Sequence, residues 1–320
     1  MTGGGGRDPG RVLVTGAGGF LGAAVVARLR DRGVTVVATD IRESLAGGGE
    51  MLACDVTDFD QVEAVIRGGT FATILHCGAV SGPMVMADRP LDIWRINAGG
   101  TAHVLEAARR HGVGRIVVCS TTEVYGQLAG RIDETTLPQP CSVYGASKLA
   151  AEQATLGYAR QHGLDAVALR LSWIYGPGRR TPTALERFLR NAIAGRDAIL
   201  DASANEFSHY LHIDDAVQGL LRAATAQSAG DRIYNISAGA GVPMTGIVEI
   251  VRRLFPAGAA SCHPASEAHS GVSDIDNRRA ELGLSFQPAV PLDLGLQRYC
   301  AALRGPNPSG TPGAVPEARR

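Results

Sequence analysis

Tyr144 and Lys148 are the residues whose types and spacing most directly suggest chemistry. They lie four positions apart at the start of a helix expected over residues 143–162, so both side chains project from one helix face. An ammonium group within roughly 4–6 Å of a phenol favours the phenolate and lowers the phenol pKa, ordinarily about 10, by about one to three units. Such a pair can remove a proton from an alcohol. An exposed pair on an ordinary helix is the alternative, but Lys148 is the only lysine among the 31 Lys and Arg residues, which indicates a position that needs a compact ammonium.

A glycine-dense stretch near the N-terminus predicts where a second reactant binds. Residues 12–15 are apolar or β-branched, and glycines follow at positions 16, 19 and 22 before a helical pattern begins. This pattern is typical of a buried strand that runs through a tight loop into a helix, whose N-terminal N–H groups can hold a diphosphate. A tight turn without a ligand, which needs only one or two of these glycines, is the alternative.

A second apolar strand, expected over residues 34–39, ends at Asp40. Its carboxylate lies near the position from which an acidic residue binds the adenosine ribose hydroxyls of a dinucleotide. Because this carboxylate would repel a 2′-phosphate, we expect NAD rather than NADP as the cofactor.

Strands and helices alternate from residue 11 to residue 172, which predicts an α/β fold with a doubly wound parallel sheet of the Rossmann type. The two longest helices are expected near residues 91–111 and 143–162. Beyond residue 172 the alternation loosens, which indicates a smaller, partly interleaved C-terminal substrate domain. The boundaries that we expect are a disordered start over residues 1–10, an NAD-binding domain over 11–172, a substrate-binding region over 173–304 of which 209–236 returns to the Rossmann domain, and a disordered tail over 305–320.

An ordered set of motifs runs from the first strand to the start of the second long helix. The motifs are Thr15-Gly16-Ala17-Gly18-Gly19-Phe20-Leu21-Gly22, Asp40, Asp55-Val56, His76-Cys77-Gly78-Ala79, Asn97, Ser120-Thr121-Thr122-Glu123-Val124-Tyr125-Gly126 and Tyr144-Gly145-Ala146-Ser147-Lys148. Together they resemble the extended short-chain dehydrogenase/reductase superfamily, specifically its NAD-dependent epimerase/dehydratase branch, over roughly residues 11–300.

This resemblance implies the catalytic roles. Tyr144 is expected to act as the general base, Lys148 to hold the nicotinamide ribose and lower the Tyr144 pKa, and Thr121 to hydrogen-bond the reacting hydroxyl. Glu123 matches an acid that members which dehydrate or decarboxylate a keto-sugar often carry. Dehydratases of the deoxysugar type usually have Asp-Glu, and Thr122 stands in the first of those places. A loop glutamate that caps a neighbouring helix is the alternative for Glu123.

The resemblance also implies the cofactor contacts. Asp40 would hold the adenosine ribose, Asp55 the adenine amino group, and Val56 would pack on the adenine ring, whereas Asn97 is expected to support the active-site backbone rather than touch substrate. The residues expected at the cofactor are Gly16, Gly18, Gly19, Phe20, Leu21, Gly22, Asp40, Asp55, Val56, Cys77, Gly78, Ala79 and Asn97, together with Tyr144 and Lys148.

The substrate side departs from the family pattern. Trp173 stands where R-x-x-N-V-Y-G-P has its asparagine, Ser208 stands where R-D-F-V-Y-V-D-D has its arginine, and no Lys or Arg lies between Leu254 and Asn277. Arginine forks are the natural clamp for a diphosphate, so these departures argue against a nucleotide-sugar substrate. Arg179, with Arg180, could supply an anion site elsewhere or be a solvated loop charge. Our candidate substrate contacts are Ser81, Thr122, Trp173 and Arg179.

We therefore expect an NAD-dependent oxidoreductase that oxidises a secondary alcohol of a free sugar, sugar acid or similar polyol. A nucleotide-sugar epimerase or dehydratase with tightly bound NAD is the alternative. A non-catalytic NAD-sensing protein is a second alternative, but such a protein would not need the pair Tyr144 and Lys148.

Composition limits the other partners. The formal net charge is zero, which leaves no electrostatic footprint for nucleic acid or an anionic membrane, and no apolar run is long enough to span a membrane. Six scattered cysteines without metal-ligand spacing indicate reduced thiols and no metal site. We expect a cytoplasmic homodimer, because the two long helices carry outward apolar residues that a partner subunit would cover. These residues are Ala98, Ala102, Leu105, Ala108, Leu149, Ala150, Ala154 and Leu156.

Overall fold

The computed structural model describes residues 7–41, 50–204, 206–227, 230–264 and 272–305. The expectations for residues 1–6 and 306–320 lie outside this described part. Residues 7–10, expected to be disordered, are instead held in place: the Arg7 backbone N–H donates to the Thr225 carbonyl at 2.9 Å, and the Arg7 guanidinium pairs with Asp165 at 3.3 Å. The disordered start therefore does not extend to residue 10.

A seven-stranded parallel sheet forms the centre of the molecule, in the order β12-β7-β5-β4-β1-β2-β3. The chain starts in the middle of the sheet, builds outward to β3, and then crosses back to build the other half, so the sheet is doubly wound as the sequence predicts. Its strands are β1 Val12–Thr15, β2 Val36–Asp40, β3 Leu52–Ala53, β4 Thr73–His76, β5 Arg115–Thr121, β7 Ala166–Leu171 and β12 Ile233–Ile236.

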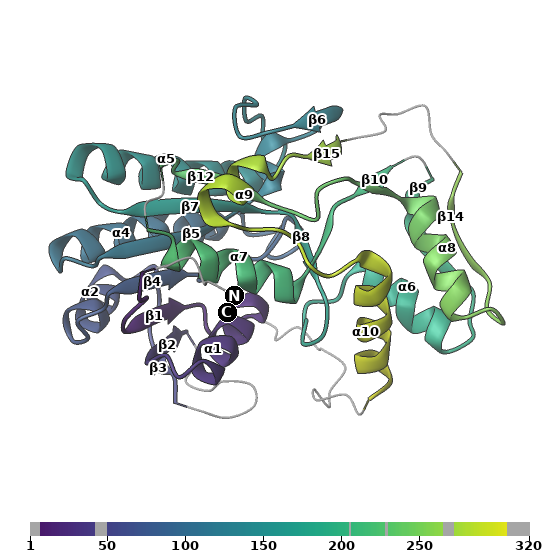
Figure 1. Ribbon diagram of the computed structural model, residues 1–320, viewed down its shortest axis with the longest axis horizontal. Helices are drawn as coiled ribbons and strands as arrows, with labels where there is room; N and C mark the ends of the chain where they lie inside the picture. The colour runs from purple at the N-terminus through teal and green to yellow at the C-terminus, as the bar shows by residue number, and fades with distance from the viewer. Residues whose placement is uncertain (1–6, 42–49, 205, 228–229, 265–271, 306–320) are drawn as a thin grey trace.

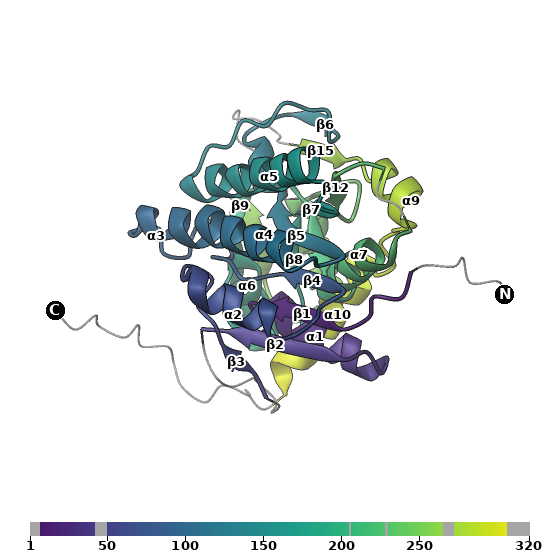
Figure 2. The same cartoon turned by 90° about the vertical axis from the view of Figure 1, so that its left-hand side faces the viewer.

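Helices cover both faces of this sheet (Figures 1 and 2). The helices α2, α4 and α5 pack beside one another on one face, and α1 and α7 pack together on the other. The strands β1, β4, β5 and β7 are fully buried between these layers, which is why most of their residues are apolar or β-branched. The helices are α1 Phe20–Asp31, α2 Phe59–Arg67, α4 Gly100–Arg110, α5 Val143–His162 and α7 Ile213–Thr225.

The first long helix differs from its prediction in one respect. It consists of α3 Pro90–Trp94, a π-helical turn Arg95–Gly99 and α4, so one wide turn interrupts it near Asn97. Such π-turns are frequent at functional sites.

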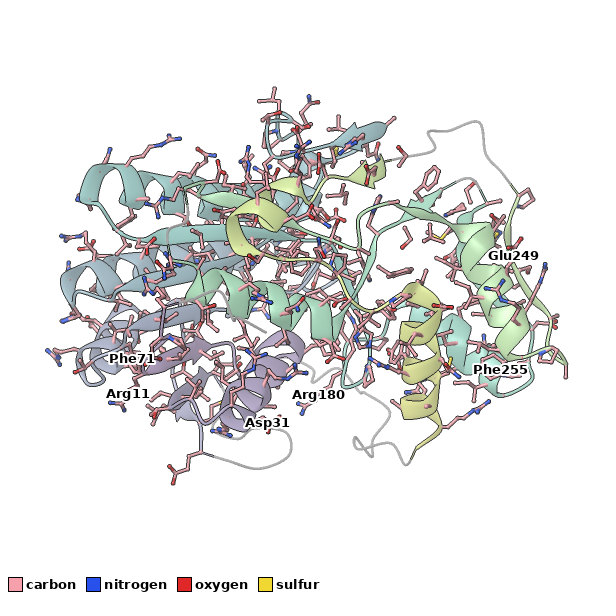
Figure 3. The ribbon with its side chains drawn as sticks, in the orientation of Figure 1. Arg11, Asp31, Phe71, Arg180, Glu249 and Phe255 are labelled. Atoms are coloured by element: carbon pink, nitrogen blue, oxygen red, sulfur yellow. The ribbon has the colours of Figure 1, made fainter. Side chains whose placement is uncertain are left out.

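On the surface of the sheet domain the guanidinium of Arg11 lies 5.3 Å above the ring of Phe71 (Figure 3).

A smaller unit lies beyond the carboxyl ends of the strands, on the right of Figure 1. Three helices, α6 Ala184–Ile193, α8 Met244–Leu254 and α10 Leu292–Arg304, share one apolar core with the parallel pair β9 Ala198–Ser203 and β14 Ala260–His263. The chain leaves this unit to form α7 and β12, then re-enters it. Because of this interleaving, one segment that precedes α7 and one that follows β12 pack together in the smaller unit.

Short strand pairs and one further helix link the two parts. The segment 207–212 forms two short strands, because its halves pair with different partners. The elements are β8 Trp173–Tyr175 with β11 Tyr210–His212, β10 Phe207–Ser208 with β13 Val242–Pro243, β6 Gly130–Ile132 with β15 Val272–Ile275, and α9 Arg278–Leu284.

Candidate active site

A cavity of about 470 Å³ opens between the carboxyl ends of the strands and the smaller unit. Both parts of the molecule contribute side chains to its wall. Among the residues expected from sequence, the wall contains Phe20, Leu21, Ala79, Ser81, Thr121, Thr122, Glu123, Tyr144, Lys148, Trp173 and Arg179. The cavity thus brings the expected catalytic and substrate residues to one place.

Tyr144 projects from the first turn of α5. Ser142 begins this helix by accepting a hydrogen bond from the Gly145 N–H at 3.0 Å, which fixes the direction in which the first turn points. Burial raises the pKa of Tyr144, while a hydrogen bond with Thr121, the last residue of β5, lowers it. Tyr144 and Thr121 are therefore close enough to bind one hydroxyl group together.

Lys148 lies one turn further along α5 and is buried. Its ammonium donates a hydrogen bond to the Cys119 carbonyl oxygen at 2.9 Å, and burial lowers the pKa of this lysine. The Tyr144 pKa lies above its usual value here, not below it as expected, because burial of the phenol outweighs the lowering by the Thr121 hydrogen bond and the Arg179 charge.

Glu123 lies in the 3₁₀ turn Thr122–Tyr125, which Thr121 caps by accepting a hydrogen bond from the Glu123 N–H at 3.2 Å. Its side chain lines the cavity, and burial raises the pKa of its carboxyl group. A carboxyl with a raised pKa can hold a proton near neutral pH and deliver it to a leaving group. The close approach of α5 needs Gly145, since a Cβ there would lie 2.8 Å from the Glu123 carbonyl oxygen.

The glycine loop forms a cradle whose shape fits the diphosphate of a dinucleotide. Gly16 has a φ of +66°, and a Cβ on it would lie 2.5 Å from the Gly78 nitrogen; a Cβ on Gly22 would overlap the Gly16 carbonyl. Helix α1 begins beside this cradle with no side-chain cap and no acidic residue in its first turn, so its N–H groups can meet an anion. A Cβ on Gly19 would also approach the Gly16 carbonyl, at 3.1 Å.

The adenosine end of the expected cofactor site lies outside the cavity wall. Asp40 ends β2, and one of its oxygens accepts a hydrogen bond from the Gly18 N–H at 3.1 Å. Asp55 follows β3 and accepts two hydrogen bonds of 2.8 Å from Thr57 through a single oxygen. Val56 is buried against the position of Gly100, where a Cβ would lie 2.7 Å from the valine side chain. These residues lie along the carboxyl ends of β2 and β3, as binding of the adenosine half requires.

A buried hydrogen-bond chain centred on His76 supports the loops, and sequence reasoning did not identify it. The Thr101 hydroxyl donates to the Asn97 carbonyl at 2.6 Å, so it accepts from His76 Nε2 at 3.1 Å. His76 Nδ1 then accepts from the Thr15 hydroxyl at 2.7 Å, and Thr15 in turn accepts from the Gly78 N–H at 3.2 Å. Burial lowers the pKa of His76 to about 3, so the ring stays neutral and this chain keeps its direction.

Asn97 continues this support toward the catalytic helix. Its side-chain oxygen accepts from the Val80 N–H at 2.8 Å, and its amide donates to the Ser147 hydroxyl at 2.9 Å. Ser147 donates to the Tyr144 carbonyl at 2.7 Å. Asn97 is fully buried and does not line the cavity, so it holds the loop after β4 against α5 rather than facing a ligand. Cys77 and Gly78 also lie behind the cavity wall.

The substrate side of the cavity contains one arginine. Arg179 donates to the Ile174 carbonyl at 2.7 Å, lies 5.7 Å over the Phe20 ring and forms no salt bridge within the described residues. Arg180 is exposed and does not line the cavity (Figure 3). Arg170, the arginine retained from the family pattern, is buried and paired with Glu152 at 2.8 Å, so it is not available to a ligand.

Most residues of the cavity wall that were not predicted come from the irregular C-terminal half, where nothing in the sequence pattern indicates which segments face the site. They include Ser172, Ile174, Leu200, Asp201, Glu206, Phe207, His209, Tyr210 and Met244. Cys119, which lies on β5, was also not predicted as a wall residue.

Two general properties follow from the described part of the chain. No helix there is both long and apolar enough to cross a membrane. No group of three or more His, Cys, Asp or Glu side chains comes together there in a way that could hold a metal ion.

Comparison with known proteins gives consistent relatives. A sequence model described as the NAD dependent epimerase/dehydratase family matches residues 12–237. The dTDP-glucose 4,6-dehydratase of Streptomyces griseus is 32% identical over 305 residues, which cover 89% of this chain and 91% of that protein. The UDP-glucose 4-epimerase of Streptomyces lividans is 30% identical over 266 residues, 77% of this chain and 81% of that one.

A solved structure has the same fold. MoeE5 in complex with UDP-glucose and NAD superposes with a TM-score of 0.81 at 30% identity, covering 92% of this chain and 99% of that one. The NAD bound to MoeE5 agrees with NAD as the cofactor expected from sequence.

Proposed function

We propose a function that proceeds from one premise: the chain belongs to the NAD dependent epimerase/dehydratase family. It is an enzyme of this family, and NAD is its cofactor. The finer proposal is that it oxidises a secondary hydroxyl of a nucleotide-linked sugar and keeps the resulting ketone bound for a second step. The observation that carries this proposal is the convergence of Tyr144, Thr121 and Lys148 on one cavity beside the glycine cradle.

The proposed substrate, a nucleotide sugar, differs from the free sugar or sugar acid that the sequence favours. The missing arginines favoured a free sugar or sugar acid, whereas the relatives are named for dTDP-glucose and UDP-glucose. Arg179 supports the second class, because a largely buried guanidinium without a carboxylate partner is suited to a phosphate oxygen. The cavity is also long enough to reach from Tyr144 to Leu200 and Met244 in the smaller unit. We propose that residues 173–304 supply this substrate side.

The chain's own residues perform the proton chemistry. Tyr144 takes the proton of the reacting hydroxyl, and Thr121 orients that hydroxyl by hydrogen bonding. Lys148, one turn further along α5, adds a positive charge to the same cavity, and a positive charge near a phenol stabilises the phenolate as the proton leaves. When bound, NAD supplies the acceptor for the hydride.

Glu123 distinguishes the two outcomes of the second step. Its buried carboxyl could protonate a departing hydroxyl, which favours dehydration. Thr122, however, stands where the resemblance leads one to expect an aspartate, which favours an epimerase that returns the hydride to the other face of the ketone. Both outcomes regenerate NAD within one catalytic cycle.

A panel of nucleotide sugars, free sugars and sugar acids, each incubated with the enzyme and NAD, tests this proposal. Products are identified by chromatography and mass spectrometry, and NADH by its absorbance. We expect a nucleotide sugar to be converted with no net NADH, with loss of water for a dehydratase or unchanged mass for an epimerase. Steady NADH production from a free sugar acid, with every nucleotide sugar unchanged, would instead support the dehydrogenase.

A further inference from the structure

Two cysteines lie side by side behind the catalytic residues. Cys77 follows the last residue of β4, and Cys119 lies on β5; the register that pairs His76 with Val118 places the two cysteines opposite each other. Their sulfur atoms are 3.7 Å apart and joined by a hydrogen bond. Because the strands are neighbours in a sheet, the Cα atoms are separated by about 4.8 Å, which lies within the range that a disulfide spans.

The two thiols differ in exposure and acidity. Cys77 is partly exposed but does not line the cavity, whereas Cys119 is buried and lines it, so a small solute within the cavity meets Cys119 first. The hydrogen-bond partner Cys77 lowers the pKa of the Cys119 thiol; burial opposes this effect, and the Lys148 ammonium adds to it. Hydrogen bonding to Cys119 and burial raise the pKa of Cys77. Cys119 is thus the thiol that a solute in the cavity meets, and Cys77 is the thiol within its reach.

We propose that Cys77 and Cys119 form an oxidisable dithiol, closed to a disulfide by a hydroperoxide that enters the cavity, and that this closure switches the enzyme off. The Cys119 thiolate attacks the peroxide oxygen, the O–O bond breaks, and Cys119 becomes a sulfenic acid as water leaves. The Cys77 sulfur then attacks the Cys119 sulfur, the S–O bond breaks, and a second water leaves. Two thiols and one hydrogen peroxide thereby give one disulfide and two waters.

Closure would disturb both halves of the active site. The sulfurs would have to approach from 3.7 Å to about 2.05 Å, drawing the two strand ends together. Cys77 begins the loop that continues through Gly78 to Ala79 in the cavity wall, and the Cys119 carbonyl holds the Lys148 ammonium. A shift at either sulfur therefore moves a wall of the cofactor site or the partner of the catalytic lysine.

Oxidation of the full-length protein with hydrogen peroxide tests this proposal without relying on activity. We expect the intact mass to fall by two hydrogen atoms and a non-reduced peptide map to contain a Cys77–Cys119 cross-link that dithiothreitol removes. NAD bound beside Tyr144 and Lys148 would cover Cys119, so at about ten times its dissociation constant it should slow cross-linking roughly tenfold, since only about one site in eleven is then free. The buried thiols of Cys54 and Cys300, whose pKa values burial raises to about 11, should remain reduced.

Three variants supply the controls. Cys141→Ser, which removes an exposed thiol remote from the pair, should still form the cross-link, whereas Cys77→Ser and Cys119→Ser should not. Turnover, measured for each variant relative to its own untreated sample, should return with dithiothreitol only where the cross-link formed. Absence of the cross-link in the wild type at peroxide levels that oxidise Cys141 would overturn the proposal. If peroxide caused the same dithiothreitol-reversible loss of turnover in Cys77→Ser as in the wild type, the proposed switch would be overturned, whatever the substrate proves to be.

Discussion

The Lys148 ammonium lies 2.9 Å from the carbonyl oxygen of Cys119, and this hydrogen bond joins the catalytic helix α5 to strand β5. The same strand ends two residues later at Thr121, the hydrogen-bond partner of Tyr144. Helix and strand thus deliver the base, the cation and the orienting hydroxyl as one rigid unit. The predictions below depend on this unit and on the loops that it faces.

Replacing Tyr144 by phenylalanine should lower turnover by roughly 10²-fold or more, because the ring remains but the proton acceptor is lost. NAD affinity, measured by titration, should change little. Tyr158→Phe is the matched control, since Tyr158 lies on the same helix but does not line the cavity. Near-normal turnover of Tyr144→Phe would require a different base.

The position of Asp40 predicts the choice of cofactor. NAD should bind at least tenfold more tightly than NADP, a difference of about 1.4 kcal/mol, because a 2′-phosphate would meet the carboxylate. Asp40→Ser should narrow this preference, while Asp31→Ser, at the far end of α1, should leave it unchanged. Equal dissociation constants of the wild type for the two cofactors would contradict the assignment.

How much of this could be predicted from sequence differs between the two halves of the chain. Helix α5 and strands β5 and β7 lie where apolar periodicity places them, because local pattern and burial agree there. Helix α10 was missed: Gly295 weakens its helical pattern, and the need for glycine becomes visible only in the fold, where a Cβ would collide with the Tyr175 hydroxyl.

The residues of the candidate site also differ in how far the sequence predicts them. The glycine loop and the Tyr144 helix carry their signals in short contiguous motifs, whereas the two partners of His76 come from separate segments, β1 and α4. The prediction of which residues face a partner subunit was partly wrong, since Leu105 and Ala108 are buried against the sheet core. One face of a helix cannot be assigned to a partner before its packing on the sheet is known.

Glu123 predicts a pH dependence. Its pKa is raised by burial, so the carboxyl keeps its proton above the usual range and loses it as pH rises. If Glu123 is the acid of a dehydration, that step should slow as pH rises through the raised pKa. Glu123→Gln should abolish this fall in rate at high pH, while NAD binding persists. A pH–rate profile for product formation checks both; an unchanged fall in rate in the variant would exclude Glu123.

The buried pair of Arg170 and Glu152 predicts a stability difference. Arg170 also lies 4.7 Å from the Tyr125 ring, and Glu152 accepts a further hydrogen bond from Ser120, so each charge has a second contact besides the ion pair. Arg170→Met should lower the free energy of unfolding by about 3–5 kcal/mol, because it leaves Glu152 buried and unpaired. The double variant with Glu152→Leu should recover part of that loss. Urea unfolding of the two variants measures both free energies. A double variant less stable than Arg170→Met alone would contradict the prediction.

We propose a homodimer through α3, α4 and α5, on the basis of their exposed side. Leu91, Trp94 and Val143 are exposed apolar residues on these helices. A second copy would cover them. Light scattering at micromolar concentration should give twice the mass of the 33.3 kDa chain, and Trp94→Glu should shift the result toward one chain. A wild-type mass of a single chain would refute the dimer.

The central claim is that Tyr144 removes a hydroxyl proton while hydride passes to NAD and is then returned. Stopped-flow absorbance of the NAD-loaded enzyme, mixed with the nucleotide sugar that it converts, measures this directly. We expect NADH to appear and disappear within a turnover in the wild type, and its appearance to be slowed by roughly 10²-fold or more in Tyr144→Phe. Product formation without any transient NADH would contradict the account.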